Sequence, residues 1–339
     1  MALREAATAV VVVVPFGLGL SAGATADDPD PVFRFQDRAI VESSGLAVLP
    51  DGRFVTANDS GDEARVFTVD PATGRTVGVT RWEGEADDVE ALAPAGPDAV
   101  WVGDIGDNNE ERATVTAVRV PVGEGDREVR GERVMLRYPT GPANAEALLA
   151  HPLDGQLVVV TKDVFGGTVH VAPESTAPGD TVTLEERGAV IPVVTDGAFF
   201  PDGRHLVLRN YGIAMVYGWP DLEPVGRVDI PPQQQGEGIA VDADNRVYVS
   251  SEGMRSPVLE VELPPRLAAA VAGAEPEEPE EPEDSETASP SDEPTSETRG
   301  SEDLPADEDS WRSDPTRWFI FSGLIVLGLV VLVRWLRRR

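Results

Sequence analysis

A short pattern recurs five times along the middle of the chain and limits its fold more than any other feature. Each copy is the start of an apolar strand, then a tight turn rich in Gly, Pro and Asp, then a second strand. The copies begin at Ser44, Glu90, Glu146, Asp196 and Glu237, with spacings of 46, 56, 50 and 41 residues. This is the period of a four-stranded blade, so the repeat predicts an all-β, five-bladed β-propeller.

The fifth copy has room for only three strands before Leu263. The apolar segment 31–35 precedes the first copy, and we expect it to supply the missing outer strand and close the ring. Six blades are an alternative if the 56-residue interval hides a degenerate one. A β-sandwich is a third choice, but it does not explain a fivefold repeat.

The two ends of the chain predict a surface protein anchored in a membrane. Residues 1–26 have the pattern of a cleaved signal peptide, with an uncleaved anchor as the alternative. Residues 27–267 form the expected propeller domain, and residues 268–317 form an acidic, Pro-rich and Glu-rich stalk that we expect to be disordered. Residues 318–336 predict a transmembrane helix, and Arg residues 337–339 a cytoplasmic tail. The expected topology is single-pass type I, with the propeller outside the cell.

Composition excludes several classes of function. The net charge of −32 makes nucleic acid an unfavourable partner, because phosphate contacts need clustered basic residues. With no cysteine there is no disulfide, zinc–thiolate site or thiol nucleophile. Of the 28 basic residues only Lys162 is a lysine, a bias typical of GC-rich bacterial genomes.

Repeat geometry places the acidic residues on one face. The innermost strand of a blade starts on the face where the second strand ends, so the first residues of the five copies should form a ring. We expect this ring to hold calcium, because Ca²⁺ prefers several hard oxygen ligands. The predicted metal ligands are Ser44, Glu90, Glu146, Asp196 and Glu237. The alternative is that these acids are solvated separately, or pair with Lys162 and Arg209.

The ends of the second strands and the loops after them add polar residues to the same face. Glu42 and Asp88, two residues before their repeat positions, should lie near it as well. The loop 104–109 also resembles a calcium loop, without the residue order of a known motif. The predicted ligand-binding residues are Asn58, Asp59, Asp104, Asp107, Asn108, Lys162, Arg209, Asn210 and Glu252. Of these, the catalytic candidates are Lys162, Asp59, Asp104 and Glu252.

Four blade starts carry a resemblance: Glu42-Ser43-Ser44-Gly45-Leu46, Asp88-Val89-Glu90, Asn144-Ala145-Glu146 and Gly236-Glu237-Gly238-Ile239. They resemble the blade starts of calcium-activated nucleotidases, the soluble apyrases. The elements Glu-Gly-Ile-Ala and Ser-Glu-Gly are also similar to secreted phytase-like and SdiA-regulated propellers. The resemblance implies a five-bladed propeller with an axial calcium held by Ser44, Glu90, Glu146 and Glu237, with Asp196 in place of an expected Ser. Basic and aromatic nucleotide-binding motifs of the apyrases are not evident.

The sequence therefore favours a calcium-containing module at the bacterial cell surface that binds an extracellular ligand or acts as a scaffold. The alternative is a calcium-dependent hydrolase of phosphoesters or related substrates on the same face. A purely structural calcium, with partners on the sides of the blades, is a third possibility. None of the three histidines is placed as a catalytic base, and we expect Tyr211, Trp219 and Trp101 to be core residues.

Overall fold

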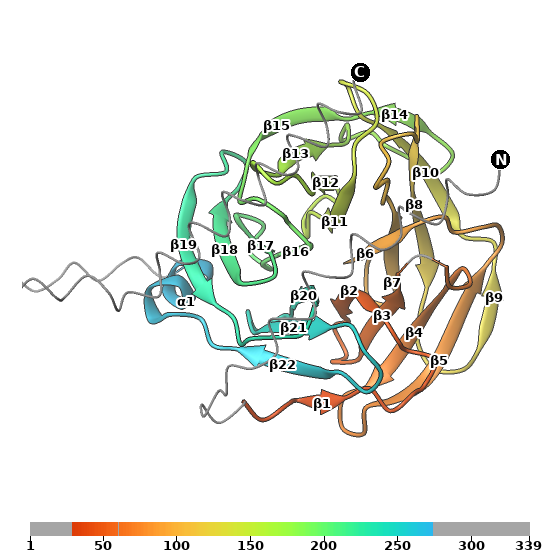
Figure 1. Cartoon of the computed structure of the whole chain (residues 1–339), viewed down its shortest axis with the longest axis vertical. Coiled ribbons are helices and arrows are strands. Elements are labelled where there is room, and N and C mark those ends of the chain that lie inside the picture. Colours follow the sequence, from red (N-terminus) through yellow and green to blue (C-terminus); the bar gives the residue numbers. More distant parts are fainter. Residues whose placement is uncertain (1–28, 60, 274–339) are drawn as a thin grey trace, which may run out of the picture. The chain divides into compact units, whose positions relative to one another are not determined.

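The structure is a computed structural model, and it describes residues 29–59 and 61–273. These residues form five sheets arranged as blades around one axis (Figure 1). The five-bladed propeller is therefore confirmed, and the six-bladed alternative is wrong. The predicted signal peptide, transmembrane helix, cytoplasmic tail and nearly all of the stalk lie outside the described residues. Within the described part of the chain, no helix is long and apolar enough to cross a membrane.

Each of the first four blades has four antiparallel strands. Blade 1 contains β2 (Ser43–Val48), β3 (Phe54–Asn58), β4 (Arg65–Asp70) and β5 (Arg75–Trp82). Blade 2 contains β6 (Val89–Pro94), β7 (Ala99–Asp104), β8 (Val115–Pro121) and β10 (Glu132–Arg137). Blade 3 contains β11 (Ala145–Ala150), β12 (Leu157–Thr161), β13 (Thr168–Val171) and β15 (Glu185–Ala189). Blade 4 contains β16 (Asp196–Phe199), β17 (His205–Arg209), β18 (Ile213–Gly218) and β19 (Pro224–Asp229).

Blade 5 is completed by the beginning of the domain. It contains β20 (Gly236–Val241), β21 (Val247–Ser251) and β22 (Pro257–Val261), and its outer strand is β1 (Phe33–Arg34). Phe33 pairs with Val258 in antiparallel register. Phe33 and Phe35 are buried in the cluster between blades 5 and 1. The predicted closure of the ring by segment 31–35 is confirmed.

Blades 1 and 2 each receive a fifth, parallel strand from the following blade. β9 (Arg127–Val129), on the connection from β8 to β10, pairs with β5. β14 (Thr181–Thr183), on the connection from β13 to β15, pairs with β10. Figure 1 shows both segments on the outside of the ring. The extra pairing covers two strand edges that would otherwise be open to solvent.

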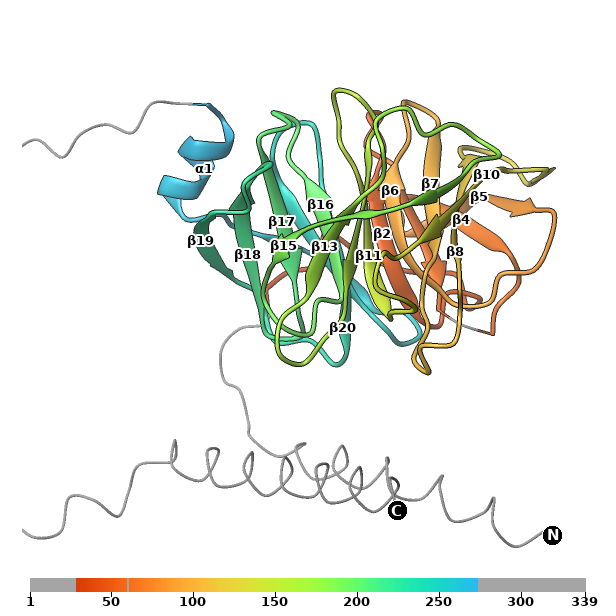
Figure 2. The ribbon, with the colours of Figure 1, turned by 90° about the horizontal axis from the view of Figure 1, so that it is seen from above.

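The innermost strands β2, β6, β11, β16 and β20 each contact the next around the axis (Figures 1 and 2). Almost every residue of these strands is buried, whereas the outer strands β10 and β19 are largely exposed. The second residue of each copy is Gly or Ala, because the strands approach closely there. A Cβ atom on Gly45 would lie 2.6 Å from the backbone nitrogen of Leu92.

A short helix, α1 (Pro265–Val271), follows the last blade. Its Leu267 and Val271 are buried in the cluster that joins blades 4 and 5. The packed domain therefore continues to Val271, a few residues past the boundary expected at residue 267.

Candidate functional site

The five predicted blade starts meet at one end of the axis. Ser44, Glu90, Glu146, Asp196 and Glu237 each open or nearly open an innermost strand, and each is at most 5% exposed. The second strands end at Asn58, Asp104, Thr161, Arg209 and Ser251, within one residue of the predicted positions. We call this end of the axis the axial mouth, defined by Ser44, Asp59, Asp88, Glu90, Glu146, Lys162 and Glu237.

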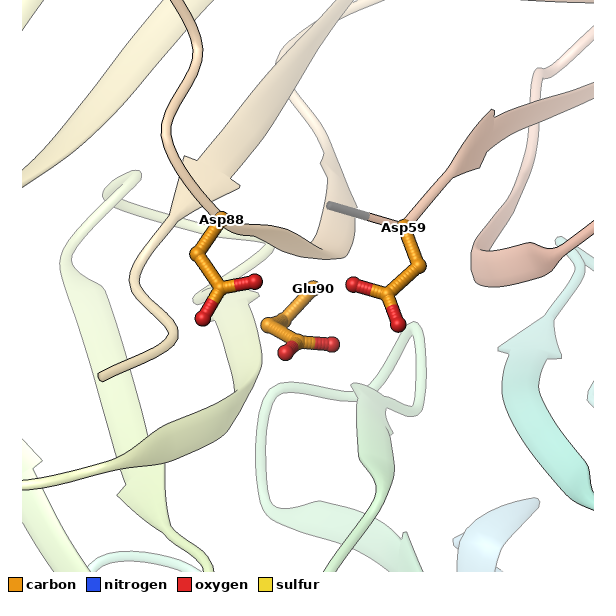
Figure 3. A group of neighbouring side chains, drawn as sticks. All are labelled: Asp59, Asp88 and Glu90. Carbon is orange, nitrogen blue, oxygen red and sulfur yellow. The ribbon is translucent and has the colours of Figure 1, made fainter. Parts of the chain in front are cut away.

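Three carboxylates come together on the side of blades 1 and 2. One oxygen from each of Asp59, Asp88 and Glu90 lies within 4.8 Å of the other two. Figure 3 shows the three carboxylate groups turned toward a common centre. The hydroxyl of Ser44 donates to the Glu90 carboxylate at 3.2 Å, which adds a fourth oxygen beside them. We call Asp59, Asp88 and Glu90 the acidic cluster.

Gly106, in the loop after β7, leaves the space that these carboxylates occupy. A Cβ atom at this position would lie 2.8 Å from Oε1 of Glu90 and closer still to the carboxylate of Asp88. The Gly106 amide donates to the main-chain oxygen of Asp88 at 3.1 Å, which holds the loop against the start of β6. The loop 104–109, predicted as a possible calcium loop, thus contributes space rather than a demonstrated ligand.

Burial and mutual repulsion make the acidic cluster costly without a cation. Burial, reinforced by the charges of Glu146, Asp59 and Asp88, raises the pKa of Glu90 to about 10. The pKa of Asp88 is also raised, first by burial and then by Asp59. Carboxylates in this state either retain protons or gain a positive counter-charge. The described residues therefore contain a buried acidic group that a metal ion could neutralise.

Glu146 has a different environment, because Lys162 neutralises it. The Lys162 ammonium lies 2.9 Å from Oε2 of Glu146 and donates to the Tyr211 hydroxyl, also at 2.9 Å. The side chain of Lys162 is 21% exposed. Ion pairing outweighs burial here, and the pKa of Lys162 is raised. The only lysine of the chain is thus held inside the ring as a fixed cation.

Asp196 lies deeper and is fully buried. Its two carboxylate oxygens accept main-chain amides, from Gly197 at 2.8 Å and from Ile239 of blade 5 at 2.8 Å. Nearby Arg209 is also fully buried, and its Nη1 donates to the main-chain oxygens of Gly238 and Ser250. Both residues join blades 4 and 5 at the axis, and Asp196 stands apart from the acidic cluster.

Glu237 is 4% exposed, and no described residue makes a hydrogen bond or ion pair with its carboxylate. Burial raises its pKa to about 8, with Lys162 opposing the shift and Glu146 and Glu252 adding to it. Glu252, on the rim, accepts a hydrogen bond from Gln235 at 2.7 Å. Burial and the charge of Glu42 raise the pKa of Glu252 to about 7.

The remaining predicted ligand-binding residues mostly organise loops. Asn58 accepts the amides of Val41 and Glu42, and Asn210 accepts those of Gly212 and Ile213. Asp104 pairs with Arg112 at 2.9 Å and accepts the amides of residues 87 and 88. Asp107 accepts the amides of residues 111 and 112, while Asn108 accepts a bond from Asn144.

Two hollows open at opposite ends of the axis. One of about 440 Å³ adjoins the acidic cluster and is lined by polar side chains, among them Asp88, Asp107, Asn108 and Arg112. A larger one of about 630 Å³ lies among the turns at the other end, and is lined mainly by Pro, Leu and Ala. Its polar groups already have partners: His151 with the oxygen of Gly203, and Asp242 with Arg246. Of these two hollows, the smaller one adjoins the acidic cluster.

The structure groups the residues of the axial mouth differently from the sequence prediction in some respects. Of the five predicted metal ligands only Glu90 belongs to the acidic cluster, and its companions Asp59 and Asp88 were expected near the mouth without a metal role. Tyr211 was expected in the core, yet it is 43% exposed and bonded to Lys162. No feature of the sequence predicted the role of Gly106, because that role depends on how two loops meet.

Comparison with known proteins identifies no family for this chain. No protein-family model matches the chain, and no curated protein matches it. The resemblance to apyrases and phytase-like propellers stays a prediction beyond the five-bladed fold itself.

Proposed function

We propose that this propeller is an extracellular binding or scaffold module that holds a calcium ion in the acidic cluster. The observation that carries the proposal is the convergence of three carboxylates, Asp59, Asp88 and Glu90, with the hydroxyl of Ser44 beside them. Hard oxygen donors of this kind suit Ca²⁺, which takes six to eight oxygens and tolerates irregular geometry. Water and the ligand itself would complete the coordination.

The hollow beside Asp88 is where a ligand would meet the ion. Its volume of about 440 Å³ falls within the range of small-molecule sites. The lining combines carboxylate and amide groups with the guanidinium of Arg112, whose Nη1 donates to the Gly106 oxygen at 2.7 Å. A polar ligand, or a polar loop of a partner protein, fits these donors and acceptors.

A thermal melt of the full-length protein tests the calcium site. Excess Ca²⁺ should raise the melting temperature relative to EGTA, because an ion that binds only the folded state stabilises it by about 2.7 kcal/mol at 100 times its dissociation constant. Glu90→Gln should abolish the rise. Glu174→Gln, an exposed acid outside the mouth, is the matched control and should keep it. No calcium-dependent shift in the wild type would refute the site.

The location at the cell surface is part of the same proposal and rests on the predicted signal peptide and transmembrane segment. Protease treatment of intact cells that express the full chain should remove the propeller and leave a small membrane-bound fragment. Protection of the propeller until the cells are lysed would contradict this topology.

A calcium-dependent hydrolase is the second candidate, favoured by the position of the hollow directly against Asp88. Bound calcium would then polarise a substrate group in that hollow. Turnover of phosphoester substrates that disappears in Asp88→Asn, with calcium still bound, would support the hydrolase. Binding without turnover would support the module.

A further inference from the structure

The axial mouth has a second group of acids, on the side of blades 3 and 5. Glu146 starts the innermost strand of blade 3, and Glu237 that of blade 5. Both side chains are at most 5% exposed, so bulk water hardly solvates either carboxylate. Both strands pack against β16 at the axis, so Glu146 and Glu237 start their strands at the same end of it, in the axial mouth.

The ammonium of Lys162 occupies this region. It contacts Oε2 of Glu146 and the Tyr211 hydroxyl, each at 2.9 Å, and lies 5.2 Å from the centre of the Tyr211 ring. Glu237 makes no hydrogen bond or ion pair to any described residue, and of the positive charges around it Lys162 lowers its pKa most. The ammonium thus contacts one carboxylate and one phenol oxygen, and Glu237 adds a second buried carboxylate, without a partner among the described residues, to the same mouth.

We propose that Glu146, Glu237 and Tyr211 form a second cation position in the mouth, and that the Lys162 ammonium fills it. This inference rests on the proposed function, because it assigns the first position to a metal ion in the acidic cluster. The consequence is that the mouth takes one divalent ion rather than two. A lysine ammonium cannot leave the site, so that half of the ring keeps one positive charge when the free ion dissociates.

The position is chemically suited to a metal ion once the lysine is absent. It offers carboxylate oxygens from Glu146 and Glu237 and the oxygen of Tyr211, and Asn144 Nδ2 steadies Glu146 Oε1 at 3.3 Å. Removing only the positive charge would leave two buried carboxylates unneutralised, which strongly favours uptake of a cation. The variant Lys162→Met keeps a chain of similar length and removes the charge.

Calcium bound per full-length protein, measured by equilibrium dialysis and metal analysis, tests the proposal. We expect one ion in the wild type, two in Lys162→Met, and one again in Lys162→Met/Glu237→Gln. Arg246→Met removes an equal charge at the other end of the axis, where Arg246 pairs with Asp242, and should keep one ion. One ion in both the wild type and Lys162→Met would overturn this inference and leave the acidic cluster intact as a site.

The other outcomes separate the two proposals. No ion in the wild type and one in Lys162→Met would refute the acidic cluster as a site and support the second position, whereas none in either refutes both. If Lys162→Met is poorly folded without metal, its melting temperature with and without calcium tests the second position instead. Excess calcium should restore the melt of Lys162→Met, through the second position, and fail to do so in the double variant. Equal recovery of both variants would overturn the inference.

Discussion

Single atoms decide what the axial mouth can hold. Gly106 leaves the space for the carboxylates of Asp88 and Glu90, and the Ser44 hydroxyl orients Glu90. Lys162 forms an ion pair with Glu146. At this scale the residue types could be predicted from the repeat, but their partners could not, because each partner comes from another blade.

Adding one methyl group should therefore close the acidic cluster without changing any charge. In Gly106→Ala the new Cβ would overlap the carboxylates, and we expect calcium affinity to fall at least tenfold by isothermal titration calorimetry. Gly212→Ala is the matched control on the same face, where a Cβ would meet only Asn210 Oδ1 at 4.0 Å. Unchanged affinity in Gly106→Ala would place the ion elsewhere.

The raised pKa values of the mouth predict how stability changes with pH. Glu237 has a pKa of about 8 in the folded protein and about 4.3 when unfolded. Between these values the folded state holds a proton that the unfolded state has lost, so the free energy of unfolding in EGTA should fall from pH 5 to pH 8. The slope is at most about 1.4 kcal/mol per pH unit for this group.

Urea unfolding at several pH values, with calcium chelated, measures this slope. Glu237→Gln should make it shallower, and Glu174→Gln should leave it unchanged. Calcium affinity should rise over the same range, because the ion competes with protons for the acids. Identical slopes in Glu237→Gln and the wild type would show that Glu237 does not titrate in this window.

At the scale of the elements, the repeat located the strands well. Innermost strands start, and second strands end, within one residue of the predicted positions, because the Gly and Asp turns and the apolar runs carry that information locally. The parallel strands β9 and β14 were not predicted, because no apolar run in the sequence marks them. Each is three residues long and is defined only by its pairing with a neighbouring blade.

Close packing of the innermost strands predicts a strong response at Gly45. In Gly45→Ala the Cβ would lie 2.6 Å from the Leu92 nitrogen, so β2 and β6 must separate. Overpacking of this kind costs about 1–3 kcal/mol, which urea unfolding would detect. Gly218→Ala, in β18, is the control, because the nearest atom to its Cβ would be 3.8 Å away. Equal stability of the two variants would argue against tight packing at the axis.

At the scale of the whole molecule, the order of the blades and their closure followed from counting the repeats. The missing fourth strand of blade 5 indicated that the start of the domain must supply it, and β1 does so. The pairing of Lys162 with Glu146 and the convergence of Asp59, Asp88 and Glu90 could not be obtained this way. Both depend on which side chains from different blades meet across the axis.

Closure by so short a strand predicts that its aromatic anchors are important. Phe35 is fully buried, and Phe35→Ala should lower the free energy of unfolding by about 3–5 kcal/mol. Val32→Ala, at a side chain 39% exposed next to the same strand, should cost far less. A small effect of Phe35→Ala in urea unfolding would mean that the ring stays closed without this anchor.

The position of α1 has a mechanical consequence. Leu267 and Val271 pack into the cluster shared by blades 4 and 5. A pulling force that entered the domain through the chain after Gly273 would load this helix before it loads β22. The helix packing would then have to break before the force reached the β1–β22 pairing, which joins only two residues of each strand.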